Sequence, residues 1–357
     1  MSKPLDLSYP PFPHPQLRTT IGLESGSSVM LEPCSAASLK PCSIAELPLI
    51  DLECLRKDPS YTHKLSQACR DWGFFLLVNH GVPLTLSEEA MAEVKQMFSL
   101  PFEAKQANSA LPLRYLWGSP SWENKLRNVN WMEGFHIPLR GHENQDHMLL
   151  QLDPFNSFRN VMADFGHHMS RIAREVFEAI PLLHLREAKR SDYMAESEAF
   201  IRAYRYPSCD ACDHFMGMEA HTDSSVLTIL SLDDSRGLQI HKDGQWLDVV
   251  PPSGTLVVNL GDMMQAMSND EYKSIEHRVV VNDATDRISI CYFSFPEHEA
   301  PISSPNYRKF TYKEFRSQVQ EDIKSSGFKV GLDRFRLNQC LKNQNQTTTG
   351  LIVIHPV

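Results

Sequence analysis

The sequence predicts a mainly β protein with flanking helices, whose core is an antiparallel sandwich or barrel. Between residues 199 and 296, short apolar runs of strand length alternate with turn residues, and no helical period interrupts them. Asp243 and Gly244 separate two of these runs, and Asp-Gly is a strong signal for a tight hairpin turn. Many short strands at regular spacing are typical of sandwiches and barrels.

The segments before this region predict an alternation of short strands and helices. Residues 46–55 indicate a short strand, residues 60–72 a helix, residues 73–82 a buried strand and residues 86–101 an amphipathic helix. Residues 105–155 lack a clear period and contain several turn signals, so we expect a loop that covers another part of the molecule.

A long amphipathic helix is predicted over residues 157–180, directly before the strands. Its apolar residues recur at helical spacing, at Phe158, Val161, Met162, Phe165, Met169, Ile172, Val176 and Phe177. His167 and His168 are adjacent and cannot share one helix face, so we interpret them as structural. After the strands, Thr311 and Glu314 have the spacing of a capping box and predict the start of an exposed helix.

The chain divides into four expected regions. Residues 1–45 are rich in Pro and Ser and predict a flexible lead-in, and residues 46–155 predict an N-terminal domain with the covering loop. We expect residues 156–336 to contain the long helix, the β core and the C-terminal helix, and residues 337–357 to form a tail.

The composition favours a small-molecule ligand. The 357 residues carry a formal net charge of -9, and no cluster of Lys and Arg is present to neutralise phosphates, which argues against nucleic-acid binding. No apolar run approaches the length of a membrane span, and the proline-rich opening lacks the apolar stretch of a secretory signal. The eight cysteines then indicate reduced thiols and a cytoplasmic protein. Cys209 and Cys212 have no second pair at zinc-site spacing, which argues against structural zinc.

His221 and Asp223 form a candidate chelating pair. In an extended strand, residues i and i+2 point to the same face, so the imidazole and the carboxylate would enter one cavity. Alone, such a pair is more often a buried histidine beside a turn-capping aspartate. His277, at the start of a later strand, supplies a second imidazole. If the three converge, they form the facial triad that binds ferrous iron and leaves coordination positions open for other ligands.

Arg287 and Ser289 form a second candidate pair on one strand face. A guanidinium and a hydroxyl on that face are suited to binding a carboxylate. The alternative for Arg287 is a surface ion pair. Its position in an apolar run favours a buried functional role, because a buried guanidinium without an anion is costly.

Together these residues resemble a known signature. His221-Thr222-Asp223, the distant His277 and Arg287-Ile288-Ser289 are similar to the motifs of the plant Fe(II)/2-oxoglutarate-dependent dioxygenases, whose core is a double-stranded β-helix, or jelly roll. The similarity runs from about residue 47 to residue 336, and the segment 310–336 resembles the gibberellin 2-oxidases, particularly those that act on C20 gibberellins.

The resemblance implies roles for these residues. His221, Asp223 and His277 would ligate Fe(II), and Arg287 and Ser289 would bind the distal carboxylate of the co-substrate 2-oxoglutarate. Tyr206 would hydrogen-bond the same co-substrate, dioxygen would be the second co-substrate, and ascorbate the expected reductant. The chain departs from the family's pattern at Tyr204, where relatives usually have Asn, and this change would alter the binding of 2-oxoglutarate or narrow the pocket.

The substrate is expected to be an apolar carboxylic acid. Arg127 is the candidate anchor for its carboxylate, with a solvated loop arginine as the alternative. Four aromatic residues are candidate pocket walls, with plain core as the alternative: Tyr115, Trp131, Phe135 and Phe293.

The predicted activity is hydroxylation of a gibberellin at the 2β position, which would inactivate the hormone. The same chemistry on another specialised metabolite, such as a flavonoid, alkaloid, steroid or other terpenoid, is the first alternative. A non-catalytic, metal-binding jelly roll is the second, and the combination of three metal ligands with Arg287 argues against it.

Overall fold

The structure is a computed structural model. It describes residues 8–10, 42–107, 113–118, 130–139, 155–182, 190–209 and 216–337. The carboxylate anchor predicted at Arg127 and the second cysteine of the pair, Cys212, lie outside these residues.

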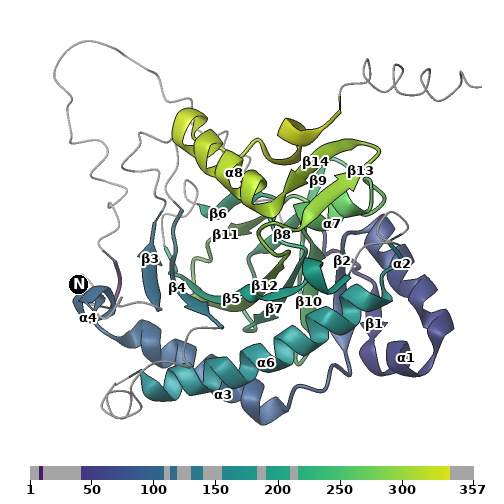
Figure 1. Cartoon of the computed structure of the whole chain (residues 1–357). Coiled ribbons are helices and arrows are strands. Elements are labelled where there is room, and N and C mark those ends of the chain that lie inside the picture. Colours follow the sequence, from purple (N-terminus) through teal and green to yellow (C-terminus); the bar gives the residue numbers. More distant parts are fainter. Residues whose placement is uncertain are drawn as a thin grey trace, which may run out of the picture.

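Two β-sheets face each other and form the core of the molecule (Figure 1). The larger has eight strands in the order β1-β2-β10-β7-β12-β5-β4-β3, and among them only β1 and β2 pair in parallel. Its strands are β1 (Leu49–Asp51), β2 (Phe74–Val78), β3 (Arg114–Trp117), β4 (Glu133–Pro138), β5 (Ala195–Tyr206), β7 (Leu227–Leu232), β10 (Leu256–Leu260) and β12 (Arg287–Phe295).

The smaller sheet is antiparallel and closes the other side of the core. Its order is β6 (Met216–His221), β11 (His277–Val280), β8 (Leu238–Lys242) and β9 (Gln245–Asp248), and a separate hairpin joins β13 (Pro301–Ser304) to β14 (Tyr307–Thr311). Asp243 and Gly244, with φ angles of 50° and 77°, form the predicted turn between β8 and β9. This arrangement confirms the predicted jelly-roll core.

Helices cover the outer face of the large sheet. In Figure 1, α3 (Leu84–Ser99) and α6 (Asn156–Ala179) run side by side beneath it. The eight apolar residues predicted on one face of α6 are all buried in the core. The other helices are α1 (Leu52–Lys57), α2 (Thr62–Asp71), α4 (Phe102–Ala107), α7 (Asp262–Met267) and α8 (Tyr312–Ser326), with short 3-10 helices at Pro59–Tyr61, Arg190–Tyr193 and Gly331–Phe335. Thr311 and Glu314 form the predicted capping box at the start of α8.

Two expectations about the first half of the chain were wrong. The predicted strand at 46–55 is a strand only as far as Asp51, whose side chain accepts hydrogen bonds from the N–H groups of Glu53 and Cys54 and so begins α1. The segment 105–155, predicted as loop, contains β3 and β4, which extend the large sheet by pairing beside β5. Strands from both sides of the expected division at 155 thus share one sheet.

A buried charge cluster lies on the outer face of β4 and β5. Glu133, which is fully buried, accepts hydrogen bonds from Lys105, Arg205 and Tyr115. The backbone oxygen of Ser8 accepts from the same lysine and arginine, at 2.5 and 3.0 Å, so residues of the lead-in pack against the sheet. Each cation in the cluster therefore has an acidic partner.

Among the described residues, no helix combines the length and the apolar character needed to cross a membrane.

Asp270 joins three separate segments in the C-terminal half. It follows α7 in a left-handed conformation, with a φ of 68°. Its carboxylate accepts hydrogen bonds from Gln265, Asn306, Tyr307 and Arg336. Although burial raises the pKa of Asp270, these hydrogen bonds, led by the one from Arg336, hold it below its usual value.

Replacement of this carboxylate should destabilise the fold. Asp270→Asn keeps a residue that tolerates the left-handed backbone, but it replaces one acceptor oxygen with a donor that faces other donors. We expect the free energy of unfolding to fall by about 2 kcal/mol in urea titrations at pH 7. Asp333→Asn is the matched control, because Asp333 contacts the same Arg336 from an exposed position and should change stability by less than about 0.5 kcal/mol. Equal effects of the two substitutions would contradict this assignment.

Candidate functional site

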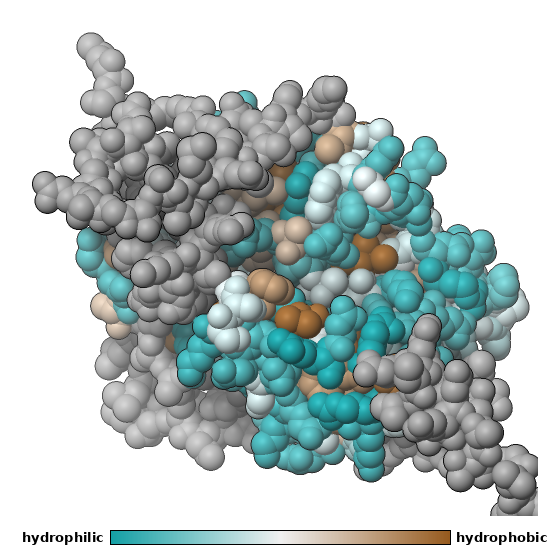
Figure 2. Space-filling view, turned by 90° about the horizontal axis from the view of Figure 1, so that it is seen from above, coloured by the Kyte–Doolittle hydropathy of each residue, from teal (hydrophilic) through white to brown (hydrophobic). Residues whose placement is uncertain are grey.

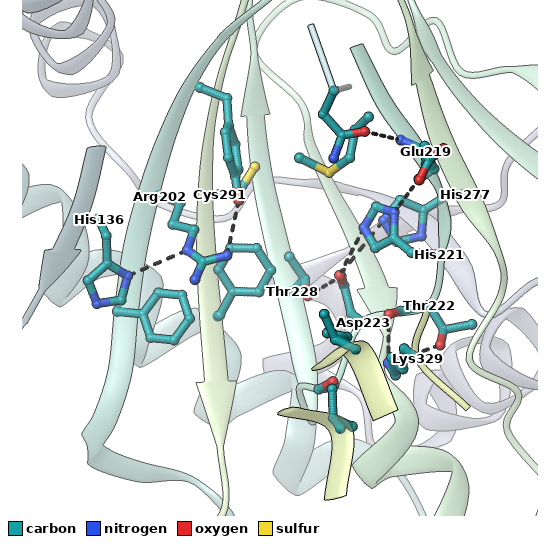
Figure 3. Close-up of a pocket in the computed structure, with 18 of the residues that line it drawn as sticks. His136, Arg202, Glu219, His221, Thr222, Asp223, Thr228, His277, Cys291 and Lys329 are labelled. Carbon is teal, nitrogen blue, oxygen red and sulfur yellow. Dashed lines mark hydrogen bonds and ion pairs between the residues drawn. The ribbon is translucent and has the colours of Figure 1, made fainter. Parts of the chain in front are cut away.

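A cavity of about 1630 Å³ lies between the two sheets. Its walls come from β4, β5, β7 and β12 of the large sheet and from β6, β8 and β11 of the small one. Figure 3 shows the polar side chains that point into it. The C-terminal part of α8 and the residues that follow line its mouth, where Ile323 and Phe328 are 39% and 63% exposed. The described surface in Figure 2 is otherwise mostly hydrophilic.

His221, Asp223 and His277 converge in this cavity. His221 ends β6 and lies directly opposite His277 at the start of β11, while Asp223 follows two residues after β6. Oδ1 of Asp223 lies 3.7 Å from Nε2 of His221 and 3.8 Å from Nε2 of His277. One donor atom from each residue lies within 4.8 Å of the others, a spacing that one metal ion could bridge.

Backbone contacts fix the tautomer of both imidazoles. Nδ1 of His221 lies 2.8 Å from the carbonyl oxygen of Glu219, and Nδ1 of His277 lies 3.2 Å from that of Ile275. Because a carbonyl oxygen only accepts, both Nδ1 atoms must carry the proton and donate it. The lone pairs of both Nε2 atoms are then free for a metal.

Hydrogen bonds also orient the carboxylate of Asp223. Its Oδ2 accepts from Oγ1 of Thr228 at 2.6 Å and from Nδ2 of Asn259 at 2.8 Å, which leaves Oδ1 directed at the imidazoles. Burial raises the pKa of Asp223, but the two histidines and these hydrogen bonds together lower it to about 2. Burial and the neighbouring His277 lower the pKa of His221 to about 4. At neutral pH this imidazole is uncharged and the carboxylate is ionised, as metal binding requires.

A lysine from beyond α8 holds the backbone between the two ligands. Nζ of Lys329 donates to the carbonyl oxygen of Thr222 at 2.8 Å and forms an ion pair with Asp262 at 2.6 Å. The backbone N–H of Asp262 in turn donates to the carbonyl oxygen of Asp223. The C-terminal segment and α7 thus restrain the loop that carries His221 and Asp223.

Arg287 lies in the same cavity as a buried cation without a hydrogen-bonding acceptor. Its side chain is 1% exposed, and none of its three guanidinium nitrogens has a partner among the described residues. The guanidinium lies 5.1 Å from the ring of Tyr206, and Ser289 is on the same strand face. Two glycines of the other wall make room, since a Cβ at Gly217 would lie 2.7 Å from Tyr206 and one at Gly237 would lie 3.2 Å from Arg287.

An unpaired buried guanidinium is costly, so this pocket is suited to an anion. Its fork of donors, with the Ser289 hydroxyl beside it, matches a carboxylate.

Comparisons with known proteins agree with this geometry. Residues 197–296 match the model of the 2OG-Fe(II) oxygenase superfamily, and residues 47–157 match the model described as non-haem dioxygenase in morphine synthesis N-terminal. Gibberellin 2-beta-dioxygenase 6 of Oryza sativa subsp. japonica is 38% identical over 81% of this chain and 85% of its own length.

The chain belongs to the 2OG-Fe(II) oxygenase superfamily.

Other relatives support the same membership. Gibberellin 2-beta-dioxygenase 8 of Arabidopsis thaliana is 36% identical over 81% of this chain and 87% of its own. The crystal structure of JOX2 in complex with 2OG, Fe and JA aligns with a TM-score of 0.70 at 29% identity, over 90% of this chain and 97% of that one. This 2OG-Fe(II) oxygenase is therefore an oxidoreductase that uses iron and 2-oxoglutarate. The donor sets at the His-Asp-His cluster and at Arg287 fit these two groups.

The predicted substrate residues of the oxygenase divide into two groups. Phe293 lines the cavity, but Tyr115, Trp131 and Phe135 are not among its described lining residues. Phe135 is 2% exposed and packs against Phe98 and Phe158 on the outer face of β4. The prediction of Tyr115 and Phe135 as pocket walls was wrong, because alternation along β3 and β4 turns both toward the outer core.

Two cavity residues of the oxygenase were missed in the sequence. His136 on β4 and Arg202 on β5 face the cavity, and Nε of Arg202 donates to Nδ1 of His136 across 3.4 Å. The period of two from Tyr206 through Tyr204 to Arg202 is a signal that could have placed Arg202 on this face.

His136 should make the stability of the oxygenase depend on pH. Burial, with Arg202, Arg114 and Arg316 nearby, lowers the pKa of His136 to about 4. A depressed histidine pKa means that the unfolded chain takes up the proton first. The contribution to stability is thus complete above about pH 6.5 and is lost as the pH falls toward 4.

Between pH 6.5 and pH 4, the free energy of unfolding should therefore fall by about 1 to 2 kcal/mol less in His136→Gln than in the unchanged protein. This value is smaller than the full pKa shift would give, because the ring is partly solvated. Urea titrations across this range measure the slope. His63→Gln, at an exposed position of α2, is the control and should leave the slope unchanged. A slope that stays the same in His136→Gln would refute the assignment.

Proposed function

We propose that this oxygenase hydroxylates a gibberellin at the 2β position in the cytoplasm, and thereby inactivates the hormone. The observation that carries the proposal is the similarity to gibberellin 2-beta-dioxygenases of two plants, at 38% and 36% identity over 81% of the chain. A cavity of about 1630 Å³ with aromatic and aliphatic walls supports a substrate with an apolar skeleton. Gibberellins are apolar carboxylic acids, the substrate class expected from the sequence.

In this proposal His221, Asp223 and His277 hold the iron, and Arg287, Ser289 and Tyr206 hold 2-oxoglutarate. When bound, iron and 2-oxoglutarate supply the oxidising power that inserts one atom of dioxygen into a C–H bond, with release of succinate and carbon dioxide. Asn259 and Thr228 orient the carboxylate of Asp223, and the carbonyl groups of Glu219 and Ile275 hold the protons on Nδ1 of the two histidines. The surrounding apolar walls exclude water from the reacting carbon.

Turnover measurements test the reaction and the substrate together. The chain is incubated with Fe(II), ascorbate, 2-oxoglutarate and a panel of C19 and C20 gibberellins, and mass spectrometry scores succinate and any product heavier by one oxygen atom. We expect both signals with at least one gibberellin. In His221→Ala, which removes one of the three metal ligands, we expect the turnover rate to fall by about 100-fold or more. If both signals appear only with another plant acid, that acid replaces the gibberellin as the proposed substrate. If folded protein gives neither succinate nor product, the proposed activity is refuted.

Arg287 provides a separate test of the co-substrate site. Arg287→Met removes the buried cation, so we expect the KM for 2-oxoglutarate to rise about 100-fold, with a smaller rise in Arg287→Lys, which keeps the charge but not the planar fork. The KM for the substrate that is to be hydroxylated should change by less than about threefold, because in this proposal that substrate contacts other walls of the cavity. An unchanged KM for 2-oxoglutarate in Arg287→Met would argue against this role.

A further inference from the structure

A second arginine lines the cavity at a distance from the first. Nε of Arg202 donates to Nδ1 of His136 at 3.4 Å, and its Nη1 donates to the hydroxyl of Tyr204 at 3.3 Å. Both partners are neutral, and no carboxylate forms an ion pair with Arg202 among the residues that the structure describes. Glu198, an acidic residue of the same wall, is paired with His298 at 2.8 Å. Arg202 thus brings a positive charge into the cavity, and no described carboxylate lies within ion-pair distance of it.

The register of β5 and β12 separates Arg202 from Arg287. Tyr206 lies opposite Arg287, whereas Arg202 lies opposite Cys291. The side chains of residues 202, 204 and 206 share one strand face, and four residues of strand correspond to about 13 Å. Figure 3 accordingly shows Arg202 and His136 on one side of the cavity and His221, Asp223 and His277 on the other. A molecule held at Arg287 leaves Arg202 free for a different anion.

The neighbours of Arg202 favour a carboxylate on an apolar molecule. Because His136 accepts from Arg202 through Nδ1, its own N–H is on Nε2 and remains available as a donor. Two donors on Arg202 are engaged, and the rest of the guanidinium can bind an anion. Phe200 lies 5.1 Å beneath the guanidinium and 5.2 Å from Phe293, so apolar surface begins directly beside the charge.

We propose that Arg202 is the subsite for the substrate's carboxylate, with Tyr204 and His136 as positioning residues that hold its guanidinium. An apolar acid would bind with its carboxylate at Arg202 and its skeleton along Phe200 and Phe293, which turns its other end toward His221, Asp223 and His277. Tyr204, the departure from the family's pattern, contributes through its hydroxyl to this subsite. The inference rests on the proposed function for the presence of an acid substrate, but it assigns the residue that recognises the acid.

The test compares acids with their methyl esters, which have almost the same shape but no charge. The full chain is loaded with Mn(II), which binds without turnover, and with saturating 2-oxoglutarate to fill the site at Arg287. Calorimetry then gives the dissociation constants of a C20 gibberellin, jasmonic acid and indole-3-acetic acid, each beside its methyl ester. We expect at least one acid to bind about 30-fold more tightly than its ester, and Arg202→Met to reduce this preference to about threefold or less.

Three further variants make the result specific. Arg202→Lys should retain part of the preference for the acid. Tyr204→Phe should weaken the binding of the acid about three- to fivefold and leave the affinity for the ester unchanged. Arg316→Met, at an exposed arginine of the same cavity mouth, should change the affinity for the acid by less than about threefold. An unchanged dissociation constant for 2-oxoglutarate in Arg202→Met shows that the variant is folded.

The outcomes separate this inference from the proposed function. Three results would overturn the subsite, even if a gibberellin is hydroxylated. They are equal binding of every acid and its ester, a preference for the acid that survives in Arg202→Met, and a preference that is lost in Arg316→Met instead. An Arg202-dependent preference for jasmonic or indole-3-acetic acid, without gibberellin turnover, would support the subsite and replace the proposed substrate.

Discussion

The antiparallel pairing of β5 with β12 is the constraint on which the cavity and its chemistry depend. From Arg287 opposite Tyr206 to Phe293 opposite Phe200, the register continues without interruption, and β7 pairs with the other edge of β12. A shift by one residue would turn Arg287 and Ser289 out of the cavity and bring apolar neighbours in. Pairing on both sides of β12 therefore fixes the direction of the guanidinium before any ligand is present, so little ordering is required when a carboxylate binds.

The charges on the cavity wall indicate how ligands and fold are coupled. In the described part of the chain, Arg287 has no acceptor and Arg202 has only neutral partners, while Asp223 directs one oxygen at the imidazoles of His221 and His277. Arg287 in particular lowers the stability of the folded protein, because it is removed from water without a compensating hydrogen bond among the described residues. A metal at Asp223 and carboxylates at the arginines would supply the missing partners. Ligand binding and global stability are consequently linked, with each ligand stabilising the folded state by mass action.

The sequence predicted the parts of this protein that depend on local spacing. The alternating strands of the core, the face of α6 and the cap at Thr311 follow from neighbours a few residues apart, and so does the His221 and Asp223 pair. The strands β3 and β4 were missed because they are short and obtain their order from β5, which lies far along the chain. The faces of Tyr115 and Phe135 were misjudged for the same reason. The environment of Arg202 depends on His136, 66 residues away, and no local pattern reports such a contact.

The two faces of β5 show what distinguishes a structural arginine from a binding one. Arg205 points outward, is buried with 6% of its surface exposed, and contacts Glu133, Asp286 and the backbone oxygen of Ser8. Arg202 points inward on the same strand and has neutral partners alone among the described residues. Arg205 is the more buried of the two and Arg202 is half-buried, so burial does not identify the arginine that faces a ligand. The difference is the acidic partner: where the fold supplies one, the arginine joins the sheet to its surroundings, and where it does not, the charge is left for a ligand.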